Sequence, residues 1–353
     1  MRKIILSLAI LIWSVVGIAA VTIFIFAAFN LSVPDRITRL PGYHVILGGS
    51  GKMFLVNEES FPVQGVQDIR INGTYHSVIV TFHDGKDLNV RQYDHENANA
   101  FEMKADGIEI VINTEPWRFG LNSIFNFGTN PRLEIEMPRI YTENVSLVTL
   151  SGSIKIEDDA AWKDVVFNSG SGSIRINGYL SANSVKTGSA SGSVTFGGPL
   201  TGETISISSS SGSIRLNGDV TGSDIKVNST SGSVRIAGSL NCYNLNVGSV
   251  SGSINLANIF ANNDVVLKST SGSINSDDIR SSNLTIESVS GSQTSGSFKV
   301  KEEIRLISTS GRIKADTVDS KNHYIRTTSG SIRIGELIGT GDVKSTSGSV
   351  RTG

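Results

Sequence analysis

Apolar and polar residues alternate along the second half of the chain in a pattern that recurs about every 20 residues. Two residues after a Ser-Gly dipeptide stands an aliphatic residue such as Ile214, and two further on a second one such as Leu216. Alternation with a period of two predicts a strand with one buried face. The repeat is marked by the glycines Gly152, Gly172, Gly192, Gly212, Gly232, Gly252, Gly272, Gly291, Gly311, Gly330 and Gly348.

A second strand is predicted in each repeat. Apolar residues recur seven and five positions before the next glycine, as Ile225 and Val227 do before Gly232. Twenty residues are too few for a βα unit of about 30, so each repeat predicts one coil of a β-solenoid. At roughly 4.8 Å between paired strands, about ten coils over residues 148–353 give a rod of about 48 Å.

The corners and one irregular coil carry further expectations. The Ser-Gly-Ser corner is interpreted as a turn at a residue that tolerates a positive φ, with stacked serines whose hydroxyls can pair with neighbours above and below. Residues 290–306 contain two Ser-Gly-Ser units and place Gln293 where other coils have an aliphatic residue. We expect a β-bulge in this coil.

Residues 43–147 differ from the repeat but are also rich in strand patterns. The stretch "HSVIVTFHDGKDLNVRQY" (76–93) predicts two strands around an Asp-Gly turn, and "GIEIVIN" and "RLEIEMP" predict two more. Terminal units of repeat proteins differ from the others because they cover the end of the core. This segment is therefore interpreted as a lead-in that caps the solenoid, and the alternative is a separate domain.

The N-terminus predicts a membrane anchor. Residues 4–29 contain no charged residue and are long enough to cross a hydrocarbon core of about 30 Å, whereas cleavable signal peptides have shorter apolar cores. Arg2 and Lys3 favour a cytoplasmic position for residues 1–3. The prediction is a single-pass protein of the cytoplasmic membrane, with a linker at 30–42 and the bulk of the chain outside the cytoplasm.

The lead-in ending in "LEIEMP", followed by "VTLSGSIKI" and a series of "SGSIRI" coils, resembles the bacterial "putative adhesin" family. Members of that family are membrane-anchored domains of unknown function. The resemblance covers roughly residues 65–353. It implies a right-handed β-solenoid with no assigned enzymatic activity and no catalytic residues to transfer.

Composition narrows the chemistry. A net charge of −1 gives no overall attraction to polyanions, and sparse aromatics in the coils argue against nucleic acid. The single Cys242 excludes an intramolecular disulfide and a cysteine-ligated zinc site.

The acidic and histidine residues favour neither catalysis nor a metal. The acidic pairs Asp158 with Asp159, Asp277 with Asp278, and Asp316 with Asp319 are interpreted as turn residues between strands. Four histidines fall in the lead-in, at 44, 76, 83 and 95. His76 and His83 are seven positions apart on one predicted strand, and an odd spacing places them on opposite faces. We therefore expect no enzyme, no metal and no cofactor.

One outward column suggests a binding surface. The residue between the two buried positions after each glycine is basic in seven of ten coils, and stacking aligns these residues into a ladder: Lys155, Arg175, Arg215, Arg235, Lys314, Arg333 and Arg351. Such a ladder suits an anionic envelope polymer. The alternative is that it only keeps a flat β-face soluble.

Three classes of function stay open at this point. The first is an adhesin-like module that binds envelope polymers or protein partners. The second is a scaffold that self-associates through the C-terminal coil, whose outer edge offers unpaired backbone groups. The third is a polysaccharide-processing β-helix.

Overall fold

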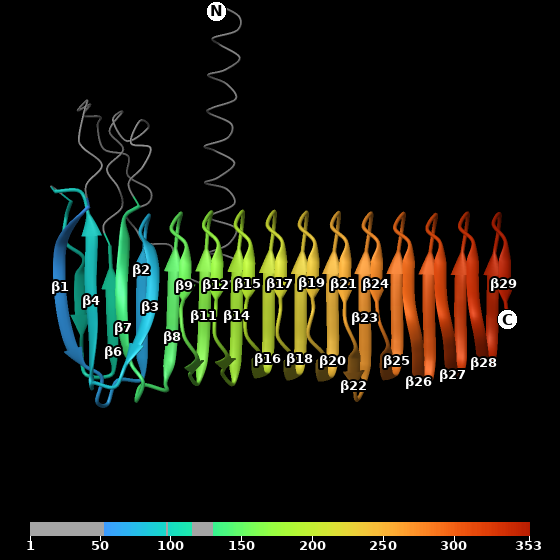
Figure 1. Cartoon of the computed structure of the whole chain (residues 1–353), viewed down its shortest axis with the longest axis horizontal. Coiled ribbons are helices and arrows are strands. Elements are labelled where there is room, and N and C mark those ends of the chain that lie inside the picture. Colours follow the sequence, from blue (N-terminus) through green and yellow to red (C-terminus); the bar gives the residue numbers. More distant parts are fainter. Residues whose placement is uncertain (1–52, 97, 115–129) are drawn as a thin grey trace, which may run out of the picture.

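The computed structural model describes residues 53–96, 98–114 and 130–353. These residues form strands and turns that wind into a rod, with the blue and cyan strands at one end and the orange and red coils at the other (Figure 1). The prediction of an all-β solenoid of about ten coils is confirmed.

Each coil contributes to three faces of the rod, and equivalent strands of successive coils pair in parallel. The first face follows each Ser-Gly corner and consists of β9 (Ile154–Ile156), β12 (Ile174–Ile176), β15 (Val194–Phe196), β17 (Ile214–Leu216), β19 (Val234–Ile236), β21 (Ile254–Leu256), β24 (Ile274–Ser276), the first residues of β26 (Gln293–Ser308), β27 (Ile313–Thr327) and β28 (Ile332–Ser345), and β29 (Val350–Thr352).

The second and third faces complete the coil. The second face consists of β10 (Ala160–Ala161), β13 (Leu180–Ser181), β22 (Ile259–Ala261), the first residues of β16 (Leu200–Ser209), β18 (Val220–Ser229), β20 (Leu240–Ser249) and β25 (Ile279–Ser288), and the middle of β26, β27 and β28. The third face consists of β8 (Asn144–Thr149), β11 (Asp164–Ser169), β14 (Ser184–Ser189), β23 (Asp264–Ser269) and the last residues of the long strands.

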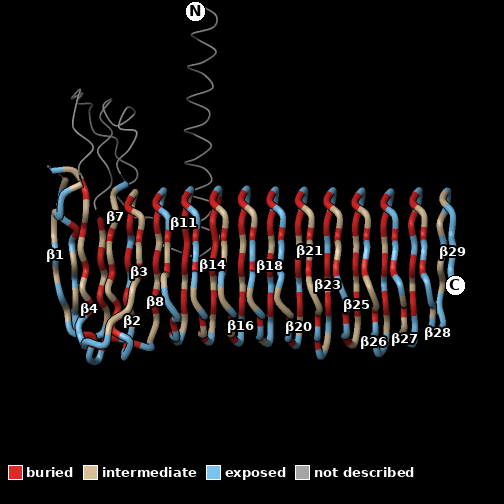
Figure 2. Tube along the Cα trace, viewed as in Figure 1, coloured by how far each residue is buried: buried red, intermediate tan, exposed pale blue. Residues whose placement is uncertain are grey.

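The core is a stack of aliphatic columns. Ile214 pairs with Val194 in the preceding coil and Val234 in the next, and all three side chains are fully buried. Figure 2 shows the buried positions recurring at the same heights along the rod. The predicted apolar columns are confirmed. They form because successive coils pair without a shift in register, which keeps each residue on its face.

Shortened repeats are absorbed at the corners. Leu240 pairs with Ile259, whereas Leu245 pairs with Val265, so a residue lost before β22 is regained before β23. The flanking columns therefore stay aligned despite the uneven spacing of the glycines.

The corner glycines are needed for a different reason from the predicted one. Among the described residues, positive φ values occur at Gly65, Gly107 and Gly339, none of which belongs to a Ser-Gly corner. A Cβ added at Gly232 would lie 2.1 Å from the carbonyl oxygen of Gly212 in the preceding coil. The corners exclude side chains because backbone stacks directly on backbone, so the prediction of a positive φ there was wrong.

Lead-in strands extend two faces of the solenoid. They are β1 (Phe54–Pro62), β2 (Asp68–Gly73), β3 (Ser77–His83), β4 (Asp87–Asp94), β5 (Glu102–Ala105), β6 (Glu109–Asn113) and β7 (Arg132–Pro138). On the first face β3 pairs with β9, β7 with β3, β4 with β7 and β1 with β4. On the third face β2 pairs with β8, β6 with β2 and β5 with β6.

The two strands around the Asp-Gly turn do not pair with each other in this arrangement. Instead β7 lies between them, since Ile135 pairs with Val80 of β3 on one side and Val90 of β4 on the other. Where the lead-in meets the coils, the Trp162 ring lies 5.6 Å from that of Phe82 and 6.1 Å from that of Phe167, measured between centroids. The lead-in and the coils thus share one core.

The irregular coil contains a bulge, but not at Gln293. This residue is buried and stays in register with Ile274 and Ile313. The shift comes later in β26, where Ser281 pairs with Val300 and Asn283 with Glu303. The Gln293 amide nitrogen donates to the carbonyl oxygen of Ile307 at 2.6 Å, which allows a polar side chain in the aliphatic column.

The predicted membrane helix at 4–29, the linker and the start of the lead-in lie outside the described residues. Within the part of the chain that the structure describes, no helix has the length and apolar character needed to cross a bilayer.

Candidate functional site

The predicted basic residues lie in one column on the first face. Register pairs Lys155 with Arg175, Arg215 with Arg235, Lys314 with Arg333, and Arg333 with Arg351. All but the half-buried Lys155 are exposed. Neighbouring strands are about 4.8 Å apart, so these cations lie side by side along the rod.

The column is divided into three groups by uncharged residues. Thr195 separates Arg175 from Arg215, and Asn255, Asn275 and Thr294 separate Arg235 from Lys314. The Asn275 amide donates to the Asn255 side-chain oxygen at 2.9 Å. The surface therefore alternates clusters of positive charge with a polar, neutral stretch.

Most of these cations make no ion pair with the part of the chain that the structure describes. Lys155 pairs with Glu157, the residue directly after the end of its own strand, β9. The other six have no ion-pair partner among the described residues. They contrast with basic residues elsewhere on the solenoid, such as Lys321, which pairs with Glu302 at 3.2 Å.

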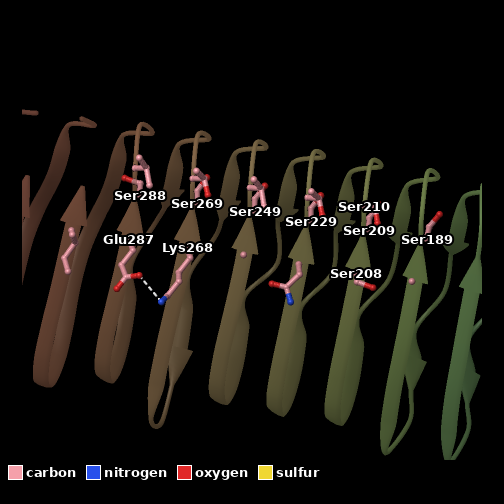
Figure 3. A pocket seen from close by; sticks show the side chains of 18 of the residues that line it. Ser189, Ser208, Ser209, Ser210, Ser229, Ser249, Lys268, Ser269, Glu287 and Ser288 are labelled. Atoms are coloured by element: carbon pink, nitrogen blue, oxygen red, sulfur yellow. Dashed lines mark ion pairs between the residues drawn. The ribbon is translucent and has the colours of Figure 1, made fainter. Parts of the chain in front are cut away.

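A groove of about 710 Å³ runs along the third face (Figure 3). Its lining is mainly small and hydroxylated, with Ser208, Ser210, Thr230 and Thr270 along its length. The charged side chains among its described lining are Lys268 and Glu287, which pair at 2.8 Å. The groove thus carries no unpaired charge and differs in chemistry from the basic column.

A buried polar cluster lies in the lead-in. His76 Nε2 lies 2.9 Å from Asp94 Oδ2, and the Tyr75 hydroxyl donates to the same oxygen at 2.6 Å. The His95 amide donates to Asp94 Oδ1 at 2.7 Å. Burial alone would raise the pKa of Asp94, but these hydrogen bonds outweigh it and hold the pKa below its ordinary value.

The histidines do not assemble into a metal centre in the described residues. His76 is buried, whereas His83 Nε2 lies 2.8 Å from the backbone oxygen of Asp87. No group of three or more metal-ligating side chains occurs within residues 53–96, 98–114 and 130–353. His44 lies outside them.

Several acidic residues hold corners together. Asp159 accepts from the Tyr179 amide at 2.7 Å and Asp278 from the Ser297 amide at 2.9 Å, each in the next coil. Asp316 and Asp319 lie within β27, so the prediction that they sit between strands was wrong. Cys242 is buried, and burial raises its pKa to about 11, which leaves the thiol unreactive at neutral pH.

A second outward row was missed by the sequence reasoning. Tyr243, Phe260, Arg280 and Lys299 lie exposed on the second face, and we call them the aromatic-basic patch. A fixed 20-residue spacing does not align them, because Asn241 pairs with Phe260, and Arg280 with Lys299, at shorter offsets. The signal that could have found them is the buried column of the second face, because the outward residue directly follows the buried one in each coil.

These features define a β-solenoid of stacked parallel coils with a β-rich lead-in at one end and a basic column along its first face. The chain belongs to the Toastrack DUF4097 family, whose model matches residues 66–256, 199–295 and 245–352. The resemblance inferred from the Ser-Gly coils is thus confirmed. No curated protein matches the chain.

Three solved structures resemble the fold. A "putative adhesin" from Parabacteroides merdae is 12% identical, with a TM-score of 0.40 over 84% of this chain and 97% of that one. A "putative adhesin" from Bacteroides fragilis (15%, TM-score 0.29) and a "putative lipid binding protein" from Parabacteroides distasonis (14%, TM-score 0.33) each cover 86% of this chain and 98% of their own. At this similarity nothing is transferred about what those proteins bind.

Proposed function

We propose that this protein is a non-enzymatic, membrane-anchored binding module of the cell envelope, and that the basic column on its first face binds an anionic envelope polymer. The observation that carries this proposal is a set of exposed cations that lie in one column and have no ion-pair partner within the described residues: Arg175, Arg215, Arg235, Lys314, Arg333 and Arg351.

The geometry suits a polymer better than a small anion. Each exposed cation is solvated and contributes little to binding alone. A repeating polyanion that follows the rod meets one cluster after another, so several weak contacts act together. The Asn255, Asn275 and Thr294 stretch supplies hydrogen-bonding groups between the charged clusters.

Anchoring rests on residues 4–29, whose charge-free run suits a membrane span with the solenoid outside the cytoplasm. Protease added to intact spheroplasts should then remove the solenoid. Digestion that occurs only after lysis contradicts this part of the proposal.

Binding is tested with the full chain in detergent and immobilised cell-wall or lipopolysaccharide material. A variant with Arg175, Arg215, Arg235 and Arg333 changed to Ser should be retained at least about tenfold less at low salt, and raising the salt should weaken the parent, because exposed charges are screened. The fold should survive, since these side chains are exposed.

A charge-matched control separates the column from overall charge. Changing Lys268, Arg305, Lys321 and Arg326 to Ser lowers the net charge equally, but each of these residues is already ion-paired. This control should be retained like the parent. Equal retention of the parent and the column variant at low salt would show that the column only keeps the face soluble.

A further inference from the structure

The second face carries an outward row that is continuous from coil to coil. Parallel register places Asn241 beside Phe260, Phe260 beside Arg280, and Arg280 beside Lys299. All four side chains are exposed. The row occupies a different face from the basic column. In each coil the basic column belongs to the first-face strand, and this row belongs to the second-face strand that follows it.

Two aromatic rings are presented here to solvent. Phe260 is 38% exposed and Tyr243 53% exposed. Tyr243 lies two residues after Asn241 on the same side of β20, with the buried Cys242 between them. Because Asn241 is the register partner of Phe260, Tyr243 is the diagonal neighbour of Phe260, and both rings are available to one ligand that follows the rod.

One cation lies against the Phe260 ring, and a second follows in the row. The Arg280 guanidinium lies 5.7 Å from the centroid of the Phe260 ring. Neither Arg280 nor Lys299 has an ion-pair partner among the described residues, although Asp319 stands in register beside Lys299. The patch therefore combines two exposed rings with two cations that make no ion pair within the described residues.

Toward the lead-in the row continues with hydroxyl side chains, whereas beyond Lys299 it continues with Asp319 and Ile338. Asn241 is followed toward the lead-in by Thr221, Thr201 and Ser181, each in register with the next. A line of hydroxyls and one amide next to exposed rings suits a chain of sugars, whose apolar ring faces stack on aromatics and whose hydroxyls need partners. Two rings among polar neighbours offer too little apolar area for insertion into a bilayer.

We propose that the aromatic-basic patch is a second binding site, a subsite for sugar rings of an acidic polysaccharide that follows the second face along the rod. Tyr243 and Phe260 stack on the sugars, and Arg280 and Lys299 bind their carboxylate groups. The inference rests on the proposed function in that it assumes an anionic envelope polymer and names it as a carbohydrate.

The test compares two polyanions on the full chain in detergent. Polygalacturonate carries its charge on sugar rings, whereas polyphosphate carries charge without them. The double variant Tyr243→Ser with Phe260→Ser should lose about tenfold in affinity for polygalacturonate, as expected for two modest ring contacts, and little for polyphosphate. Tyr243→Phe and Phe260→Tyr should keep parental affinity, since the ring faces remain.

Matched controls isolate the patch. Phe54→Ser removes an exposed aromatic side chain from β1 in the lead-in, away from the row, and should bind like the parent. In a Phe260→Trp variant, adding trigalacturonate should shift the tryptophan emission, and the parent, which lacks a tryptophan at this position, should show no such shift.

The outcomes distinguish this site from the basic column. Parental affinity of the double variant for polygalacturonate overturns the subsite, and so does an equal loss for polyphosphate, which would mean that the rings only support the cations. If the double variant loses binding only to phosphatidylglycerol vesicles and keeps its affinity for polygalacturonate, the patch binds membrane, and the sugar subsite is overturned. A trigalacturonate response without retention on envelope material would sustain the subsite and refute the proposed function.

Discussion

The hydroxyl of Ser189 donates a hydrogen bond to the carbonyl oxygen of Gly172, in the preceding coil, at 3.1 Å. The same hydroxyl accepts from the Gly192 amide at 2.9 Å. One buried side chain therefore satisfies backbone groups of two successive corners. At both corner glycines an added Cβ would clash with the backbone of the preceding coil. The bond between Ser169 and Gly152 repeats this arrangement one coil earlier.

Removing this hydroxyl should weaken the rod. We expect Ser189→Ala to lower the free energy of unfolding by about 1–3 kcal/mol, because it leaves two buried backbone groups unpaired. Ser269 stands at the equivalent position, but its hydroxyl has no hydrogen-bond partner among the residues that the structure describes. Ser269→Ala should therefore change stability by no more than about 0.5 kcal/mol. Urea denaturation measures both, and equal losses contradict the assigned role of the Ser189 hydroxyl.

Backbone stacking at the corners gives a second prediction. Gly232→Ala places a Cβ against the Gly212 carbonyl group and should cost about 1–3 kcal/mol or more, since backbone cannot move aside. At Gly248 the nearest atom to an added Cβ is the side-chain oxygen of Asn228, which can rotate away. Gly248→Ala should leave the thermal midpoint within a few degrees of the parent's. A large loss for both would mean that crowding at Gly232 is not special.

The repeat made the faces of the solenoid predictable because each side chain's direction depends on its place in the coil. Ile214 and Leu216 could be assigned to the core from alternation alone, and the basic column followed from the residue between them. The reason for glycine could not be found this way. Whether Gly232 needs a positive φ or a close approach depends on how near the next coil lies, which is a tertiary property.

Non-local pairing explains the other differences. The sequence places β3 and β4 next to each other along the chain, but β7, about 50 residues later, inserts between them. Gln293 was expected to break the register, yet bonds to carbonyl oxygens across the core keep it in place. The aromatic-basic patch stayed hidden because the residues lost at corners shift its members off the 20-residue spacing.

The face assignment has a direct test in the central coils. Ile214 and Ile225 are buried, so changing either to Asp introduces an unpaired charge into the core and should cost several kcal/mol. Arg215, between the columns, is exposed, and Arg215→Ser should change stability by no more than about 0.5 kcal/mol. Thermal unfolding followed by circular dichroism distinguishes them. Similar shifts for the core and Arg215 variants would show that the faces are misassigned.

The Asp94 cluster predicts how the lead-in responds to acid. Hydrogen bonds from His76, Tyr75 and the His95 amide hold the pKa of Asp94 below its ordinary value, and the His95 ring lies 3.9 Å away. A carboxyl with a depressed pKa in the folded state stabilises the protein fully above its unfolded pKa of about 3.9. This contribution is lost as the pH falls through the lower, folded value.

Hydrogen exchange of the lead-in amides at a series of pH values, corrected for the intrinsic exchange rate, measures this dependence. The parent should lose protection in β3 and β4 below about pH 4. Asp94→Asn should be less protected at neutral pH, but its protection should change less with pH, since the variant no longer takes up the Asp94 proton. Asp84, whose side chain is 97% exposed, supplies the control: Asp84→Asn should follow the parent's profile. If Asp94→Asn keeps the parent's acid dependence, another carboxyl group controls the stability of the lead-in.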